Sequence, residues 1–405
     1  MSGQNRSRQN IATPPGKPGG LGGLLIERGF TAWASKFAIR IATLIGKPVR
    51  IGKTVLAIRY ADVREALSRD LDFIIKPVND PPFEVIGYRF VLGMDRSAEL
   101  ARERAALYKA LARVDMAKLQ LTALHAAHTR IAAADGNIDV VENYARPIAA
   151  GTAQALFGLR GTESAQLMDA ARAVFYYGFL DGAGSPLIKA RAVSAAELMS
   201  GWFDAEITKR RESRQYGDDL MGALLAQAEV SDDQIRRTLG GMFVGSIDPV
   251  AGATARIMTV MMRDDNLRES ATRDADNIPA LMSWCLEAMR RWPNGPILGR
   301  KAARDTMLGG TKVSAGMNII LWTQAAMFDP SAFPAPFMMR RDRDADAYLH
   351  FGAGLHPCAG RSINAWQLPI LVGQLLKQRP TKLGKMRWAG PFPAHLPLDL
   401  TGGSL

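Results

Sequence analysis

The stretch His350–Gly360 reads HFGAGLHPCAG, and its one cysteine, Cys358, stands at the end of a glycine-rich turn. An apolar run at helical spacing begins shortly afterwards, at Ile363. The first turn of a helix stabilises a thiolate through its dipole and its free N–H groups, and glycines let the backbone approach a ligand closely. The stretch therefore predicts a thiolate that holds a large flat cofactor against bare backbone. The alternative is a buried structural cysteine, the usual role of a lone cysteine.

The same stretch resembles the haem-binding loop of the cytochrome P450 family, whose pattern is Phe-Gly-x-Gly-x-His-x-Cys-x-Gly. Every fixed position matches, from Phe351 and Gly352 through His356 to Cys358 and Gly360. The resemblance implies haem b as the cofactor, with Cys358 as the ligand of its iron and Phe351, Gly352 and His356 against the haem. It also implies the family's fold, which is mainly α: a triangular helical domain with a small β-rich subdomain.

Two arginines are expected at the haem carboxylates. Arg300 begins an Arg-x-Ala-x-x-Asp sequence that resembles the family strand whose arginine pairs with a haem propionate, as His356 is also expected to do. Arginine suits a carboxylate because it can donate two parallel hydrogen bonds. The family's early His-x-x-x-Arg pattern is altered here: Leu100 replaces the histidine, while Arg104 remains and Arg102 is an alternative. A surface arginine is the competing interpretation of Arg300.

Glu287 and Arg290 share one face of a helix that the pattern predicts over residues 275–291. Such a pair is usually a solvated contact that contributes little. The family has an internal Glu-x-x-Arg pair of this kind, completed by an arginine from a proline-rich segment, and Arg343 falls at the matching place. The resemblance gives the pair a structural role rather than a chemical one.

The candidate catalytic residues lie in a predicted buried helix over residues 231–263. Where the family has an acid followed by threonine, this chain has Asp248 and Pro249. A proline inside a helix removes a backbone hydrogen bond and kinks the helix, but it lacks the hydroxyl that would relay a proton. Ser246 is the replacement hydroxyl, acting through water, whereas Thr254 belongs to a different face. A simple helix break is the alternative, although a buried aspartate without a partner is costly.

Composition bounds the class of protein. The 405 residues are 47% hydrophobic and 22% charged, which is ordinary for a globular protein. Cys285 and Cys358 are the only cysteines, so a disulfide framework is excluded. No apolar run is long enough to span a membrane, and no signal peptide is recognisable, which predicts a cytoplasmic protein. Residues 1–23 are expected to be a disordered leader, and residues 24–405 a single domain.

The net charge of +12 is spread along the chain without interleaved aromatic residues, which argues against nucleic acid as a partner. It favours a basic face for an acidic protein, an electron carrier of the ferredoxin or flavodoxin type. The candidate residues of that face are Arg361, Lys377, Arg379 and Lys382.

Periodicity and propensity predict the remaining elements. A hairpin is expected over residues 48–60, and short strands within 300–322. Helices are expected over residues 61–68, 97–133, 139–157, 162–179, 187–212, 217–229 and from Cys358 to about Gln378. The proline-containing stretches 76–93 and 329–343 are expected to be irregular.

The resemblance implies a haem-thiolate monooxygenase that oxidises an apolar small molecule with O₂, as a monomer served by a separate electron donor. Because Pro249 replaces the usual threonine, use of peroxide, or a rearrangement or dehydration, is the alternative within haem chemistry. A haem-binding sensor without turnover is the alternative of another class. Pocket walls are expected from residues 76–94, 175–179, 243–247 and 296–298.

Overall fold

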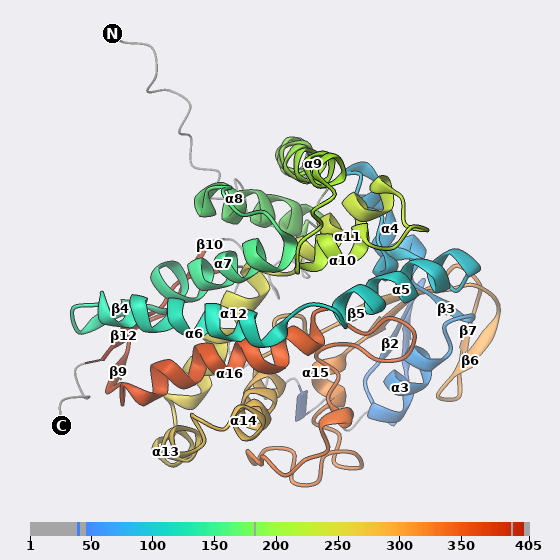
Figure 1. Ribbon diagram of the computed structural model, residues 1–405. Coiled ribbons are helices and arrows are strands. Elements are labelled where there is room, and N and C mark those ends of the chain that lie inside the picture. Colours follow the sequence, from blue (N-terminus) through green and yellow to red (C-terminus); the bar gives the residue numbers. More distant parts are fainter. Residues whose placement is uncertain (1–38, 41–45, 182–183, 390–391, 401–405) are drawn as a thin grey trace.

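The computed structural model describes residues 39–40, 46–181, 184–389 and 392–400, so the expected leader over residues 1–23 lies outside the described residues. The described chain is mainly helical with small sheets, which confirms the predicted fold class. Figure 1 shows long helices on one side and a strand-rich part beside α3 and α5 on the other. None of its helices is long and apolar enough to cross a bilayer.

The helices begin and end as follows: α3 Tyr60–Ser68, α4 Lys76–Val85, α5 Ala98–Leu111, α6 Met116–Ala132, α7 Arg146–Phe157, α8 Ser164–Phe175, α9 Pro186–Ser213, α10 Leu220–Leu225, α11 Asp232–Val244, α12 Asp248–Met261, α13 Asp265–Arg273, α14 Ile278–Arg291, α15 Thr323–Ala326 and α16 Arg361–Lys377. Shorter helical turns are η1 Val91–Gly93, η2 Val140–Ala145, η3 Tyr176–Leu180 and η4 Ala345–Ala347. The strands are β1 Val49–Ile51, β2 Thr54–Ala57, β3 Phe73–Ile74, β4 Asn137–Asp139, β5 Leu298–Ala302, β6 Thr306–Leu308, β7 Thr311–Val313, β8 Asn318–Leu321, β9 Lys382–Leu383, β10 Arg387–Ala389, β11 Phe392–His395 and β12 Pro397–Asp399.

The largest sheet has the strand order β1-β2-β8-β5-β3. The predicted hairpin is confirmed, because Ile51 pairs with Thr54 around a turn in which Gly52 has a φ of +57°. β2 runs parallel to β8, and β5 runs antiparallel to it with Arg300 opposite Ile319. The sheet therefore places Arg300 in a strand that is hydrogen-bonded on both sides.

The expected irregular stretch from residue 76 is wrong in its first half, which forms α4. Pro77 lies in the first turn of α4, where a missing N–H costs nothing. Asp95 supports this start, because its Oδ1 accepts hydrogen bonds from the N–H groups of Ile75 and Lys76, each 2.9 Å long. The acceptor comes from a residue far along the chain, so local propensity could not indicate it.

Other predicted helices are shorter or divided. The stretch 97–133 forms α5 and α6, and Asp115 begins the second by accepting a hydrogen bond from the N–H of Lys118 at 3.0 Å. The stretch 139–157 begins as the π-helical turn η2, and only its second part is α7. Residues 217–229 contain only the six-residue α10.

Glu287 lies in α14 with a fully buried carboxylate. Arg290 donates to both of its oxygens, at 2.8 and 2.9 Å. The hydroxyl of Tyr348 donates to it at 2.7 Å and the N–H of Arg340 at 3.0 Å. Arg343 completes the cluster, with its Nε 3.2 Å from Oε1. The structure thus confirms the predicted internal pair and its third member, and the cluster joins α14 to the segment that leads into the cysteine loop.

We expect Glu287→Ala to lower the free energy of unfolding by about 3–5 kcal/mol, because two buried guanidinium groups would lose their anion. Burial disfavours ionisation of Glu287, but the hydrogen bond and charge of Arg290 prevail and lower its pKa. A lowered pKa stabilises the folded state above the ordinary carboxyl range and stops doing so in acid. The difference between wild type and variant in urea denaturation should therefore shrink as the pH falls.

The matched control is Lys118→Ala, which removes an exposed ion pair with Asp218 and should leave stability nearly unchanged. Equal stability of Glu287→Ala and wild type would contradict the structural role of the cluster.

Candidate haem site

The cysteine loop is closed on itself just before α16. The N–H of Cys358 donates to the carbonyl of Phe351 at 2.7 Å. Gly352 and Gly354 have φ values of +67° and +73°, a region that L side chains rarely adopt. A Cβ on Gly354 would lie 2.0 Å from the carbonyl oxygen of Leu67. The turn therefore requires glycine and fixes the position of Cys358 at the helix start.

The Cys358 side chain is half-buried, and burial raises the pKa of its thiol while the N–H of Gly360 lowers it. Coordination to a metal ion deprotonates a thiol outright. No group of three or more His, Cys, Asp or Glu side chains in the described part of the chain could hold a metal ion. An ion at Cys358 would therefore have to bring its other ligands with it, as the iron of a porphyrin does.

Arg300 is a buried cation in β5, with 6% of its surface exposed. Its Nη1 donates to the carbonyl of Gly299 at 2.7 Å. No carboxylate of the described residues lies within ion-pair distance. Burial lowers the pKa of Arg300 to about 10, against the opposing charge of Asp95. A buried guanidinium without an anion is costly, so this side chain fits a ligand carboxylate rather than the surface position that was its alternative.

His356 and Arg104 converge on the same loop. The Nε2 of His356 lies 2.7 Å from the carbonyl oxygen of Met94, so this nitrogen carries the proton. Burial lowers the pKa of His356. Arg104, on α5, donates to the carbonyl of Leu355, whereas Arg102 is exposed. Of the two alternatives, Arg104 is therefore the arginine that reaches the cysteine loop.

These positions together fit a haem. The loop supplies the thiol of Cys358 for the iron. β5 supplies Arg300, a buried cation without a carboxylate partner among the described residues, which could bind a haem propionate. His356 stands close enough to Arg300 for the charge of Arg300 to oppose its protonation. Cys358, Phe351, Gly352 and His356 would form one wall of the haem site, with Arg300 and Arg104 beside its carboxylates.

The predicted helix over residues 231–263 is two helices, because α11 ends at Val244 and α12 begins at Asp248. Pro249 lies in the first turn of α12, where its missing N–H is tolerated. The side-chain amide of Asn294 donates to the carbonyl of Pro249 at 2.6 Å. The Ser246 hydroxyl donates to the carbonyl of Phe243 at 2.6 Å. The chain is therefore interrupted, not merely kinked, at this point.

Asp248 is buried but paired. Its Oδ1 accepts hydrogen bonds from Arg172 at 2.6 and 3.0 Å, and the Nε of Arg146 lies 3.2 Å away. Its Oδ2 is buried and accepts no hydrogen bond from the described residues. Thr254 donates to the carbonyl of Val250 at 2.9 Å. Neither arginine was predicted, and the sequence offers no spacing that links them to Asp248, because they come from α7 and α8.

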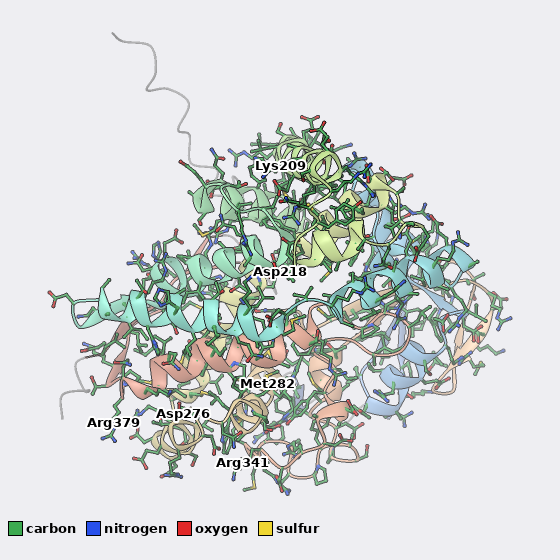
Figure 2. All side chains as sticks on the ribbon, in the orientation of Figure 1. Lys209, Asp218, Asp276, Met282, Arg341 and Arg379 are labelled. Carbon is green, nitrogen blue, oxygen red and sulfur yellow. The ribbon has the colours of Figure 1, made fainter. Side chains whose placement is uncertain are left out.

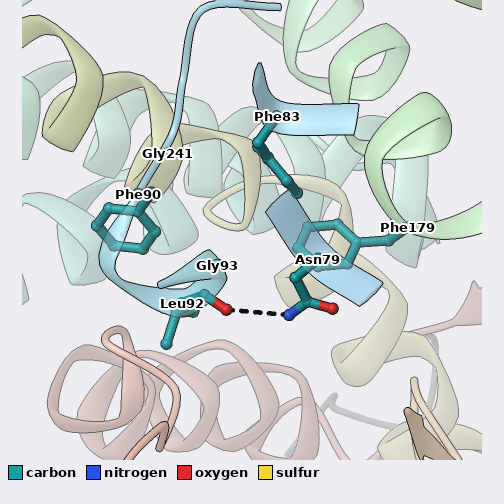
Figure 3. Close-up of a pocket in the computed structure, with 7 residues that line it drawn as sticks. All are labelled: Asn79, Phe83, Phe90, Leu92, Gly93, Phe179 and Gly241. Atoms are coloured by element: carbon teal, nitrogen blue, oxygen red, sulfur yellow. Dashed lines mark hydrogen bonds between the residues drawn. The ribbon is translucent and has the colours of Figure 1, made fainter. Parts of the chain in front are cut away.

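A small hollow, partly open to solvent, lies beside α4. Its lining residues are Asn79, Phe83, Phe90, Leu92, Gly93, Phe179 and Gly241 (Figure 3). Two of the predicted walls, 76–94 and 175–179, contribute to it. The other two predicted segments, 243–247 and 296–298, do not line this pocket.

Comparisons with known proteins agree with this geometry. The sequence profile of the family described as "Cytochrome P450" matches residues 167–379. A steroid C26-monooxygenase of Mycolicibacterium smegmatis is 28% identical over 205 residues, 49% of this chain and 48% of that protein. A mycinamicin IV hydroxylase/epoxidase of Micromonospora griseorubida is 27% identical over 218 residues, 51% and 53% of the two chains. The match thus spans about half the length of these curated relatives.

The crystal structure of CalO2 matches with a TM-score of 0.79 at 20% identity, over 94% of this chain and 99% of that one. At this identity the likeness shows the fold alone.

We expect Arg300→Leu to speed the transfer of haem to apomyoglobin about 10- to 100-fold, because hydrogen bonds to a charged group contribute about 1.5–3 kcal/mol. The haem-free variant should be at least as stable as the haem-free wild type, since it no longer buries an unpaired cation. Lys301→Leu, one position along β5 and facing the other side, should transfer haem at the wild-type rate. An unchanged rate for Arg300→Leu would contradict the propionate assignment.

We expect Cys358→Ser to abolish the long-wavelength absorption band that is typical of reduced, carbon monoxide-bound thiolate haem. Cys285 is fully buried in α14, and burial raises the pKa of its thiol, so it is a structural cysteine. Cys285→Ala is therefore the control and should keep the band. A band that survives in Cys358→Ser would refute the ligand assignment.

Proposed function

Since the chain belongs to the cytochrome P450 family, we propose that it is a haem-thiolate monooxygenase acting on an apolar small molecule. In the overall reaction one atom of O₂ enters a C–H bond of the substrate. Electrons and protons from outside reduce the other atom to water. Bound haem would supply the oxidative chemistry, because a thiolate ligand donates electron density to iron and favours O–O cleavage. The observation that carries the proposal is the closed Cys358 loop beside Arg300, a buried cation that has no carboxylate partner among the described residues.

The residues around the start of α12 would determine how protons reach the bound oxidant. One oxygen of the Asp248 carboxylate is paired with two guanidinium groups, and the hydroxyl of Ser246 donates its hydrogen bond to a backbone carbonyl. Pro249 has no hydroxyl. Proton delivery therefore depends on water held near the free Oδ2 of Asp248, and we expect it to be slow.

The same observation favours a second candidate, the use of hydrogen peroxide. Peroxide and a C–H bond give an alcohol and water without external electrons or protons, so the absence of a hydroxyl at Pro249 would cost nothing. A rearrangement or dehydration would need no oxidant at all. Ligand binding without product under either oxidant would support the sensor instead.

An acidic ferredoxin or flavodoxin is the proposed electron donor. Among the four candidate basic residues, Arg361 pairs with Asp346 at 2.9 Å and Lys377 pairs with Asp276. Figure 2 shows Asp276 and Arg379 along the same edge of the molecule. Arg379 and Lys382 are exposed, which makes these two the stronger candidates for docking. We propose that the protein acts as a monomer in the cytoplasm. Structural disulfides are rare in that compartment, which fits a chain with two cysteines.

The experiment compares product formed per NADPH consumed, using a surrogate ferredoxin and its reductase, with product formed from peroxide. The ligand is the one that gives the largest haem spin-state change in a screen of apolar compounds. We expect wild type to be uncoupled and to release peroxide, because a positioned proton donor contributes about 10²–10⁴-fold. Pro249→Thr should raise the coupling.

Pro249→Ala is the matched control, since it removes the proline without adding a hydroxyl. If alanine improves coupling as much as threonine does, the backbone and not the hydroxyl is responsible. Tight coupling in wild type, lost in Pro249→Thr, would contradict the idea of a missing proton relay.

A further inference from the structure

The first turn of α12 has no capping side chain. Ile247, which precedes the turn, makes no side-chain hydrogen bond to it, and Pro249 within the turn has no N–H. Helix ends without caps open more easily than helix centres. The carboxylate of Asp248 belongs to this turn and is held by Arg172 and Arg146 from other helices. The position of Asp248 therefore depends on contacts that reach the turn from outside α12.

Asn294, in the connector between α14 and β5, makes a further contact with this turn. Its Nδ2 donates to the carbonyl of Pro249 at 2.6 Å, and its Oδ1 accepts a hydrogen bond from the Nη1 of Arg256. Pro249 and Arg256 are seven residues apart, so they share one face of α12, two turns from each other. A Cβ on Gly252, between them, would lie 2.8 Å from that Nη1 and 3.2 Å from Oδ1. The amide of Asn294 therefore spans two turns of α12 against bare backbone.

Arg256 is a buried cation that orients this amide. It is 6% exposed, and no carboxylate of the described residues lies within ion-pair distance of it. Burial lowers the pKa of Arg256 to about 10, so the guanidinium remains charged at neutral pH. It lies 5.4 Å from the ring centroid of Trp388 and 5.9 Å from that of Trp292, which offsets part of the cost of burial. Because a guanidinium can only donate, Oδ1 of Asn294 must face Arg256, and Nδ2 is left for the carbonyl of Pro249.

The connector that carries Asn294 is itself fixed on both sides of this residue. The side-chain amide of Gln324 donates to the carbonyl of Arg291 at 3.1 Å. The backbone N–H of Gln324 donates to the carbonyl of Pro296 at 3.0 Å. The same connector leads into β5, which carries Arg300. Asn294 therefore ties the start of α12 to the segment that ends in the proposed haem contact.

We infer that Asn294, oriented by Arg256, is a positioning residue that holds the first turn of α12 and thereby the carboxylate of Asp248. The inference rests on the proposed function only in its consequence for proton delivery. When this contact is lost, the turn opens more often, and Asp248 no longer holds water at one place. Because a proton donor acts only when it is positioned, the transfer of reducing equivalents into product should become less efficient.

The test compares Asn294→Asp and Asn294→Ala with wild type, all as haem-loaded proteins. Aspartate keeps an acceptor for Arg256 but loses the N–H that Pro249 receives, whereas alanine loses both. Hydrogen–deuterium exchange over residues 251–254 should be about 2- to 10-fold faster in both variants, the factor that one hydrogen bond corresponds to. In urea, Asn294→Asp should be at least as stable as wild type, because its carboxylate gives Arg256 an anion. Asn266→Ala, at an exposed position on α13, should match wild type in both measurements.

The two oxidants separate positioning from a general structural role. Product per NADPH should fall in both Asn294 variants, while product from peroxide, which needs no external proton, should fall less. Equal losses with both oxidants would overturn the inference, because a distorted fold impairs both reactions. Exchange at the wild-type rate in Asn294→Asp would overturn it as well. A wild type that forms no product with either oxidant would instead refute the proposed function, and the exchange rates would still decide whether Asn294 holds the turn.

Discussion

The buried carboxylate of Glu287 is the contact on which the cysteine loop depends. It collects hydrogen bonds from Arg290 within its own helix and from Tyr348, two residues before the loop begins. A fully buried charge is tolerated only when its hydrogen bonds are satisfied, and such a network then admits one arrangement. The cluster therefore fixes the segment before His350 against α14. Together with the glycine turn of the loop itself, this contact holds Cys358 at the start of α16.

Two other buried charges show how the molecule distributes its ion pairs. On the α12 side, Asp248 has two arginines on one oxygen, so its charge is satisfied by the protein. Beside the cysteine loop, Arg300 has no carboxylate in the described chain. Since an unpaired buried cation is the more costly of the two, Arg300 is the residue that we propose binds a carboxylate of the cofactor. The charge of Asp248 is thus balanced within the described chain, whereas the charge of Arg300 is left for the proposed ligand.

The features that could be predicted from the sequence are those that depend on residues close together in the chain or on a recognised family pattern. The spacing of Glu287 and Arg290 places them on one helix face, but their burial and the Arg343 contact were predicted only from the family pattern, as was the role of the cysteine loop. The arginines of Asp248 could not be predicted, because Arg146 and Arg172 come from helices 102 and 76 residues earlier and follow no fixed spacing. The helix α4 was not predicted, because its prolines argue against a helix. The carboxylate of Asp95, which supports the start of α4, belongs to a residue about 20 positions later in the chain.

The hollow beside α4 and the break before α12 belong to one packed framework. Arg172, which binds Asp248, lies 5.2 Å from the ring centroid of Phe392. Phe392 meets Phe175 at 5.8 Å, and Phe175 meets Phe179, which lines the hollow, at 5.1 Å. Because close-packed side chains leave little room for independent movement, a shift of Phe175 must be accommodated by Phe392 and Arg172 along this row. The hollow beside α4 and the carboxylate of Asp248 are therefore linked through one row of packed side chains, although one is apolar and the other charged.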